Sequence, residues 1–303
     1  RKYINRPIAL IPCAYGGTFM KDWNPAIRHD VNNSLYNYML SRINMTGGNI
    51  KGVLWSQGEG DACDEAKASN YEQAMLNFID TLRRDVNKPQ LPFIIVQTGR
   101  FCTAGSSQPS SSWEKVRNAQ LHITRKRKFV FVVGSADLPL DDPIHISYEG
   151  HKQLGRRLAE VALTNIYNKK NHANQIDLSS IEFLDPNTIS APPCFPKPAR
   201  FKIKFNGVSG KLTSQGRPTG FQIRCNSQDN IPMFFRTDFD ESDPSAIILS
   251  VAFSKGFAPQ NGLYLVYAGG MDPYVNITDI ADMPLPAFGP VEMPAKIGAI
   301  NKY

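Results

Sequence analysis

The sequence predicts an α/β domain built around a parallel β-sheet, followed by a smaller β-rich domain. Up to about residue 168, short apolar runs alternate with amphipathic helical patterns, which is typical of strands joined by crossover helices. The strand-like runs are continuously apolar, as a sheet buried on both faces requires. Beyond residue 200 the pattern changes to short alternating runs separated by Gly, Asn and Asp turns, which predicts antiparallel β-structure.

Four strands and two helices are expected in the α/β domain. The strands are predicted over Pro7–Ile11, Gly52–Trp55, Pro92–Gln97 and Phe129–Val133. Between the second and third, apolar residues from Tyr71 to Leu82 recur at spacings of three and four, which predicts one face of a helix. After the fourth, Ser147 is placed to cap a helix whose apolar face begins at Leu154 and whose polar face carries Arg157.

The two domains are expected to be joined by a linker. Residues 1–170 are assigned to the α/β domain, residues 171–200 to the linker, and residues 201–303 to a β-sandwich-like domain. The linker region is rich in Asn, Lys and then Pro, which disfavours both helix and central strand. The strands of the second domain are expected over Phe201–Phe205, Gly220–Arg224, Ala246–Phe253 and Leu263–Tyr267.

Composition and charge exclude several classes of protein. A chain of 303 residues with 42% hydrophobic and 20% charged residues is ordinary globular composition. No apolar run approaches the ~20 residues that cross a bilayer, so no membrane span is expected. The net charge of +7 is spread along the chain, so no nucleic-acid partner is expected. The five cysteines contain no C-x-x-C pair and predict no zinc site, and their odd number leaves at least one unpaired within the chain.

Glycosylation sequons suggest the compartment. Asn32, Asn44 and Asn276 each begin an Asn-x-Ser/Thr triplet, which agrees with a secreted or lysosomal protein of the secretory pathway. The sequence opens Arg-Lys-Tyr without an initiator Met, as expected for a proteolytically processed product.

Three polar segments follow three of the predicted strands. The first strand is followed by Gly16 and Gly17, which can present backbone N–H groups, and the second by Gln57, which can offer a neutral side-chain N–H donor. The fourth is followed by Asp142 and His145, where the carboxylate can accept the Nδ1 proton and leave Nε2 free as a general base. Because parallel strands end at one edge of a sheet, the three segments can converge around one reacting carbonyl.

Each segment also has a simpler interpretation. Glycine turns and solvated acids explain the first two, and D-x-x-H is a common tetrapeptide. An acidic cluster could hold a divalent cation, although its members follow no ordered ligand pattern; they are Glu59, Asp61, Asp64 and Glu65. We therefore expect neither a metal nor an organic cofactor.

The motifs PCAYGGT, LWSQGEGD and DDPIHISYEGHKQLGRR, in this order, resemble the sialate O-acetylesterase group of SGNH hydrolases, close to acetylxylan-type carbohydrate esterases. The resemblance implies a flavodoxin-like α/β fold with helices on both faces of the sheet. It implies that His145 is the base, Asp142 its orienter, and Gly17, with Gly16, a backbone oxyanion donor. Gln57 takes the place of the side-chain amide donor.

The family resemblance also implies roles for neighbouring residues and a substrate. Glu59 and Asp61 match positions that we interpret as support of the loop, with no direct chemical role. The substrate class implied is an acetylated carbohydrate.

One departure from the family pattern concerns the nucleophile. The family serine lies in a Gly-Gln-Ser turn after the first strand, and this sequence has no such turn. Ser56, Ser135 and Ser147 are candidate substitutes, and none of them matches the family position. Omitting an interior strand would leave buried backbone groups unpaired at ~1–3 kcal/mol each. We therefore expect an N-terminal fragment of the same precursor to supply both the strand and the serine.

Two functions follow from these observations. The first is a carboxylic ester hydrolase that removes O-acetyl groups from a carbohydrate by a serine mechanism. The alternative is a catalytically inactive SGNH scaffold that binds glycan or protein. The combined presence of the base, its orienter and the oxyanion donors favours the enzyme, whereas the missing serine favours the scaffold.

Overall fold

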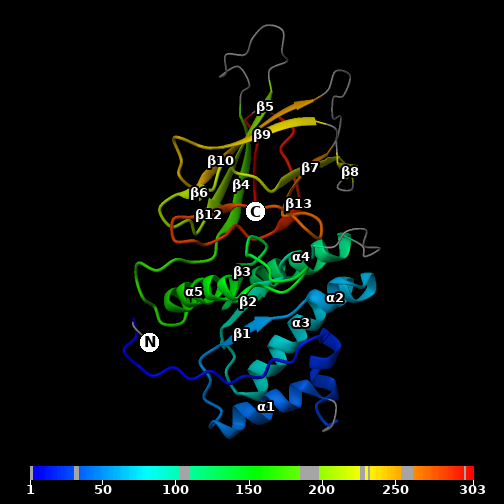
Figure 1. Cartoon of the computed structure of the whole chain (residues 1–303), viewed down its shortest axis with the longest axis vertical. Coiled ribbons are helices and arrows are strands. Elements are labelled where there is room, and N and C mark those ends of the chain that lie inside the picture. Colours follow the sequence, from blue (N-terminus) through cyan, green and yellow to red (C-terminus); the bar gives the residue numbers. More distant parts are fainter. Residues whose placement is uncertain are drawn as a thin grey trace. The chain divides into compact units, whose positions relative to one another are not determined.

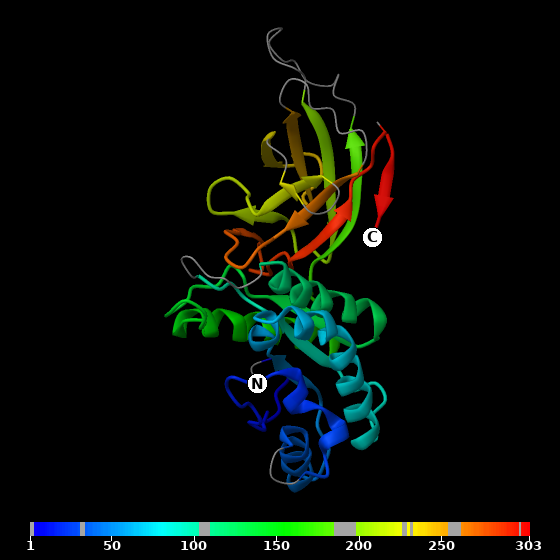
Figure 2. The same ribbon diagram turned by 90° about the vertical axis from the view of Figure 1, so that its right-hand side faces the viewer.

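The computed structural model describes residues 3–30, 34–102, 110–184, 198–225, 229–230, 233–253, 262–296 and 298–303. The chain divides into two compact units, Arg1–His172 and Ala173–Tyr303. The first unit has the α/β architecture and the second is built from antiparallel strands (Figures 1 and 2). This confirms the predicted fold class.

A three-stranded parallel sheet forms the centre of the first unit, in the order β1-β2-β3. The strands are β1 (Val53–Ser56), β2 (Phe93–Gln97) and β3 (Val130–Gly134). Each lies within one residue of its predicted range. Every residue of β2 is buried, so the middle of the sheet is covered on both faces, as the apolar runs predicted.

Helices connect and cover this sheet. The elements are η1 (Met20–Trp23), η2 (Pro25–Ile27), α1 (Leu35–Met45), α2 (Glu59–Ala62), α3 (Glu65–Asp85), α4 (Ser110–Lys126) and α5 (Tyr148–Asn165). The crossovers from β1 to β2 and from β2 to β3 run in the same direction, so right-handed connections place α3 and α4 on one face, where they contact each other. Helix α5 contacts β2 and β3.

The strand predicted over Pro7–Ile11 is wrong. This segment has no regular secondary structure and pairs with no strand, and Ile8 and Leu10 are exposed. A strand needs a neighbour to satisfy its backbone groups, and among the described residues of this unit only β2 pairs with β1. As a result β1 is an edge strand, and the Leu54 side chain on it is 53% exposed.

The second unit contains two larger antiparallel sheets and one strand pair. The sheet orders are β14-β4-β5-β10-β9, β13-β11-β7-β8 and β12-β6. The strands are β4 (Asp177–Leu184), β5 (Ala199–Asn206), β6 (Leu212–Ser214), β7 (Phe221–Cys225), β8 (Asp229–Asn230), β9 (Met233–Phe239), β10 (Ala246–Phe253), β11 (Leu263–Tyr267), β12 (Ile277–Asp279), β13 (Phe288–Glu292) and β14 (Ile300–Lys302). Phe205 of β5 contacts Phe288 of β13, so the two larger sheets pack face to face.

The linker expected over residues 171–200 contains β4, which is a full strand of the second unit. Its pairing with β5 shifts register between Leu178 and Ser180. This irregularity breaks the simple alternation by which a half-buried strand is recognised, which explains why the sequence pattern did not predict it.

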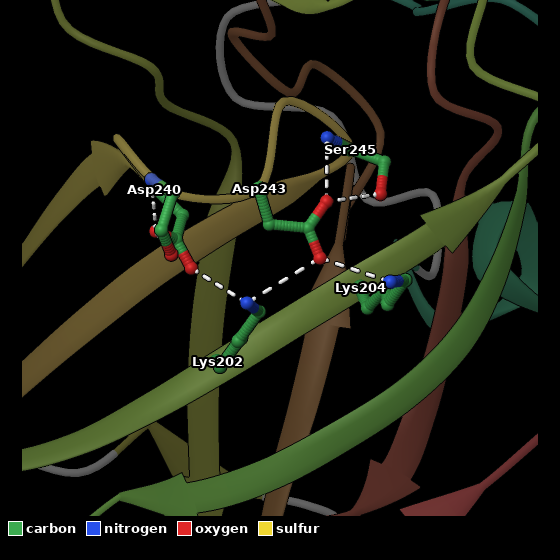
Figure 3. A network of polar contacts seen from close by, with 6 residues as sticks. Lys202, Lys204, Asp240, Asp243 and Ser245 are labelled. Carbon is green, nitrogen blue, oxygen red and sulfur yellow. Dashed lines mark hydrogen bonds and ion pairs between the residues drawn. The ribbon is translucent and has the colours of Figure 1, made fainter.

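An ion-pair network joins β5 to the loop between β9 and β10 (Figure 3). Asp243 accepts from Lys204 at 2.9 Å and from the Ser245 hydroxyl at 2.6 Å. Lys202 lies between Asp240 at 2.8 Å and Asp243 at 3.3 Å. The hydrogen bonds from Ser245 and then Lys204 hold the pKa of Asp243 below its ordinary value.

Three further features concern membrane spans, metal ligands and cysteines. No helix in the described part of the chain is long and apolar enough to cross a membrane. Within the same residues, no three His, Cys, Asp or Glu side chains are grouped as metal ligands. Cys13 and Cys63 are free thiols, whereas Cys194 lies outside the described residues.

Candidate active site

A tight loop between β3 and α5 carries Asp142 and His145. An isolated bridge between Leu140 and Ile146 closes its base, and the Asp141 amide donates to the His145 carbonyl at 3.0 Å. The loop then enters α5 at Ser147, whose hydroxyl accepts from the Gly150 amide at 3.1 Å and caps the helix as predicted.

Gly150 is required for this loop to pack against the start of α5. A Cβ at this position would lie 2.6 Å from Ile146 Cγ2 and 2.9 Å from the Pro139 carbonyl oxygen. The glycine therefore lets the loop lie directly on the first turn of the helix.

The predicted pair is formed within this loop. His145 Nδ1 and Asp142 Oδ2 are 2.6 Å apart. Asp142 Oδ1 accepts the backbone N–H groups of Ile144 at 2.9 Å and His145 at 2.7 Å. These hydrogen bonds, with that from the His145 amide the strongest, lower the pKa of Asp142 to about 2. An ionised carboxylate accepts the Nδ1 proton, so Nε2 is left with its lone pair.

The imidazole is open to solvent on its other side. The His145 side chain is 78% exposed, and its hydrogen bond to Asp142 is made through Nδ1, not Nε2. The ring is thus oriented from one side and accessible from the other, which is the arrangement a general base requires.

A buried ion pair fixes the chain on both sides of this loop. Arg157 of α5 donates to Asp137, just after β3, through two hydrogen bonds of 2.9 and 2.6 Å. Arg157 is buried, contrary to its predicted place on the polar face of the helix. Its partner lies 20 residues away in a loop, and no helical periodicity could reveal it.

The segment after β1 forms a second part of the site. Gly58 has a φ of +155° and its added Cβ would lie 2.3 Å from Thr98 Oγ1. At Gly60 the Cβ would lie 3.1 Å from both the Phe19 ring and the Thr18 carbonyl oxygen. The two glycines therefore allow the chain to turn into α2 while packing against neighbouring segments.

Gln57 lies in this turn and is 8% exposed. Its Nε2 donates to Asp61 Oδ2 at 2.6 Å and to the Thr18 carbonyl at 3.0 Å. Its backbone carbonyl accepts from the Tyr71 hydroxyl at 2.9 Å and from Gln120 Nε2 at 3.0 Å. Both side-chain N–H groups are thus occupied in this structure. The role of Gln57 as an oxyanion donor stays a prediction, and it requires one of these two bonds to be given up.

The glycine turn lies next to Gln57, because Gln57 bonds to Thr18, the residue after Gly17. Gly17 has a φ of +71°, which a residue with a side chain rarely adopts. Gly16 and Gly17 are both exposed, and their amide N–H groups have no acceptor among the residues described. They are available to an incoming oxygen.

Glu59 links the two halves of the site electrostatically. Burial raises its pKa, and hydrogen bonds from the Glu59 and Gly58 backbone, followed by weaker attraction from His145 and then Arg117, oppose the rise. The His145 loop therefore lies within electrostatic range of the turn that holds Gln57. Asp61 is 3% exposed, and burial raises its pKa as well.

The three serines considered as nucleophiles do not contact His145 in the described structure. Ser135 is buried and donates to the Gln97 carbonyl at 2.7 Å, and Ser147 caps α5. Ser56 ends β1 and is exposed.

The sequons differ in their surroundings. Asn44 is exposed in α1, whereas Asn32 lies outside the described residues. Asn276 Nδ2 donates to the carbonyls of Gln215 at 2.8 Å and Arg217 at 2.9 Å. Attachment of a glycan to Nδ2 would remove one of these hydrogen bonds, so Asn276 is a poorer site for glycosylation than Asn44.

Comparisons with known proteins bear on the family and the fold of this chain. Residues 1–164 match the family described as carbohydrate esterase, sialic acid-specific acetylesterase. A protein of Arabidopsis thaliana named as a probable carbohydrate esterase is 38% identical over 162 residues, which cover 52% of this chain and 56% of that protein. The structure of a carbohydrate acetylesterase from Xanthomonas citri matches with a TM-score of 0.68 and 22% identity, over 90% of this chain and 59% of that one.

This chain thus spans little more than half the length of the proteins it matches. The likeness to the Xanthomonas citri structure supports the fold of both units, and the family match spans the predicted catalytic and oxyanion-hole residues. On these grounds the chain belongs to the sialic acid-specific acetylesterase family of carbohydrate esterases.

Proposed function

We propose that this protein removes O-acetyl groups from carbohydrates by a serine mechanism. The observation that carries the proposal is the pair formed by Asp142 and His145 at 2.6 Å, with Nε2 free. The N–H groups of the Gly16–Gly17 turn and the amide of Gln57 lie in neighbouring segments, where a developing oxyanion needs donors.

The reaction requires two acyl-transfer steps. A serine hydroxyl attacks the acetyl carbonyl carbon, and His145 Nε2 takes its proton. Gly17 and Gln57 donate to the carbonyl oxygen as it becomes negative. Collapse breaks the bond to the sugar oxygen, which receives the proton from His145. Water, deprotonated by the same nitrogen, then attacks the carbonyl carbon of the acetyl-serine; the bond to the serine oxygen breaks, His145 returns the proton to that oxygen, and acetate leaves.

The serine is proposed to arrive on a segment outside these 303 residues that pairs with the outer edge of β1. The Val53 amide donates to the Pro92 carbonyl, so alternate residues Leu54 and Ser56 direct their backbone groups away from β2. Gln57 Oε1, at the same end of β1, is buried without a hydrogen-bond partner among the described residues. An added strand and its turn can satisfy such groups, which otherwise cost ~1–3 kcal/mol each.

Co-expression tests this proposal. The chain is produced together with the upstream segment of its precursor, and hydrolysis of 4-nitrophenyl acetate, O-acetylated sialic acid and acetylated xylan is measured. We expect activity only in the assembly, abolished by His145→Ala and retained in His151→Ala, which removes an exposed histidine of α5 that has no role in the site. A stable assembly that hydrolyses no acetyl ester would favour the inactive scaffold that binds glycan or protein.

A secretory location is proposed from the exposed sequon at Asn44. Expression in a eukaryotic secretory system should add one glycan that is removed by an amidase and is absent from Asn44→Gln, as measured by mass spectrometry. A secreted chain without a glycan on Asn44 would remove the support that this sequon gives to a secretory location.

A further inference from the structure

Asp61 connects the two predicted oxyanion donors. Its Oδ2 accepts from Gln57 Nε2 at 2.6 Å and from the Met20 backbone amide at 3.0 Å. Met20 begins η1, immediately after the segment that contains Gly16 and Gly17. One buried oxygen therefore contacts both the amide donor and the chain that presents the glycine N–H groups.

The bond to Asp61 also fixes which way the second Gln57 hydrogen points. An amide nitrogen carries two hydrogens in one plane, so when Asp61 holds one, the other is directed to the Thr18 carbonyl at 3.0 Å. A hydrogen bond to a carboxylate is stronger than one to a neutral carbonyl. The Gln57 hydrogen that the Thr18 carbonyl accepts is thus the more weakly held of the two, and an oxyanion beside that carbonyl can share or take it while Asp61 keeps the other.

We propose that Asp61 is a positioning residue that holds Gln57 and the Gly16–Gly17 turn in the geometry in which both donate to the oxyanion. This extends the proposed esterase function and rests on it. Asp61 would act on Gln57 much as Asp142 acts on His145, because a carboxylate orients the group that touches the reacting atoms in each case.

Asp61 is also accessible to protons despite its burial. It lines a cavity of about 380 Å³ between η1 and α3. The charged or titratable groups around it are Lys21 and Asp22 of η1 and Lys67 and Tyr71 of α3. Burial raises the pKa of Asp61, and the hydrogen bonds from Gln57 and Met20 and attraction by Lys67 lower it. Protonation would remove the charge that holds Gln57, so activity should fall as the pH falls through the pKa of Asp61.

The test compares Asp61→Asn with Asp22→Asn in the co-expressed assembly. Asp22 Oδ2 accepts the Phe19 amide at 2.8 Å, so its variant loosens the same segment without contacting Gln57. In Asp61→Asn the one side-chain oxygen can still accept from both Gln57 and Met20, so the variant removes the negative charge that strengthens these two hydrogen bonds. We expect kcat of Asp61→Asn to fall about 10- to 100-fold with KM unchanged, and Asp22→Asn to stay within about twofold of the parent. Equal losses in both variants would show that Asp61 only supports the segment and would overturn the proposal.

A double variant shows whether Asp61 acts through Gln57. If it does, Asp61→Asn should slow the Gln57→Ala variant much less than it slows the parent, because only the hold on the Gly16–Gly17 turn is then left to lose. Multiplied losses would contradict the proposal.

A spectroscopic readout separates this inference from the esterase proposal. In the ¹⁵N-labelled assembly, the Gln57 side-chain amide signals, assigned by their absence in Gln57→Glu, should shift with pH in the parent and not in Asp61→Asn. Signals that are unaffected by Asp61→Asn would overturn the positioning role. Failure of the esterase proposal has a different signature: the parent hydrolyses no acetyl ester although the signals still shift, and the catalytic part of this inference then fails as well.

Discussion

Asp142 performs two tasks with its two oxygens. Oδ1 holds the loop through the backbone amides of Ile144 and His145, and Oδ2 faces the imidazole Nδ1. Because these bonds lower the pKa of Asp142 to about 2, the carboxylate becomes protonated only as the pH falls towards that value. An acid limb of the activity profile at higher pH must therefore arise from other groups.

The two tasks can be separated by Asp142→Asn. The amide oxygen can still accept the two backbone N–H groups, so the loop should keep its conformation. The amide nitrogen, however, donates to Nδ1 and places the imidazole proton on Nε2, where it prevents proton abstraction. We expect kcat in the assembly to fall about 10³- to 10⁴-fold with KM and the urea unfolding midpoint unchanged. A loss below tenfold would mean that Asp142 does not orient the base.

Contacts between residues that are close in the sequence could be predicted better than contacts between residues that are far apart in it. Asp142 and His145 are three residues apart on a constrained loop, so their contact could be predicted. Arg157 and Asp137 are far apart in sequence, and the residue type alone suggested a solvated arginine. Asp61 lies four residues from Gln57, yet its contact with Met20, 41 residues away, could not be inferred.

At the scale of elements, Gly58 determines whether β1 can turn into α2. A methyl group there would meet Thr98 Oγ1 at 2.3 Å and Val116 Cγ1 at 2.9 Å, and φ is +155°. Gly58→Ala should therefore lower the free energy of unfolding by about 2–4 kcal/mol. Gly155→Ala is the matched control, because nothing lies within 4 Å of its added Cβ in α5, and it should stabilise by about 0.5–1 kcal/mol. Urea unfolding of the assembly measures both; equal effects would contradict the packing argument.

Strand and helix prediction succeeded where burial is regular. Strands β1, β2 and β3 were found because both faces are covered, whereas the segment over Pro7–Ile11 has an apolar sequence but no neighbouring strand. Helix α1 was not predicted, although its sequence carried a signal. Ser34 caps it, and its buried residues Tyr36, Met39 and Ile43 follow at helical spacing.

The ion pairs between β5 and the β9–β10 loop make this part of the second unit sensitive to acid. The pKa of Asp243 is lowered by Ser245 and Lys204, so its contribution is present above the ordinary Asp pKa of about 4 and is lost as the pH falls below it. Asp243→Asn keeps an oxygen for Ser245 and loses the partner of Lys202 and Lys204.

Hydrogen exchange of β5 and β10 amides, followed by mass spectrometry, measures this effect. At neutral pH Asp243→Asn should lower local stability by about 0.5–1 kcal/mol, and the difference from the parent should shrink below pH 4. Asp238→Asn, which removes the exposed partner of Arg236, should change little. A difference that does not depend on pH would exclude the ion pairs as its cause.

At the scale of the whole molecule, the outer edge of β1 determines how this chain associates, both with itself and with the segment that carries the serine. An unpaired parallel strand with an exposed apolar residue is a template for any extended segment, including a second copy of the same edge. The chain alone should therefore associate edge to edge, and the segment that carries the serine should compete with this association.

Leu54→Pro tests whether the outer edge of β1 binds both a second copy of the chain and the segment that carries the serine. The Leu54 amide points away from β2, so proline removes a donor from the outer edge and leaves the bonds between β1 and β2 in place. The isolated variant should form fewer large species in light scattering than the parent, and co-expression with the upstream segment should no longer restore esterase activity. Leu54→Thr keeps the amide and reduces the exposed apolar surface, so it should lower association while still accepting the segment. If Leu54→Pro were restored to full activity by the upstream segment, pairing at the β1 edge could not be the way in which the serine reaches His145.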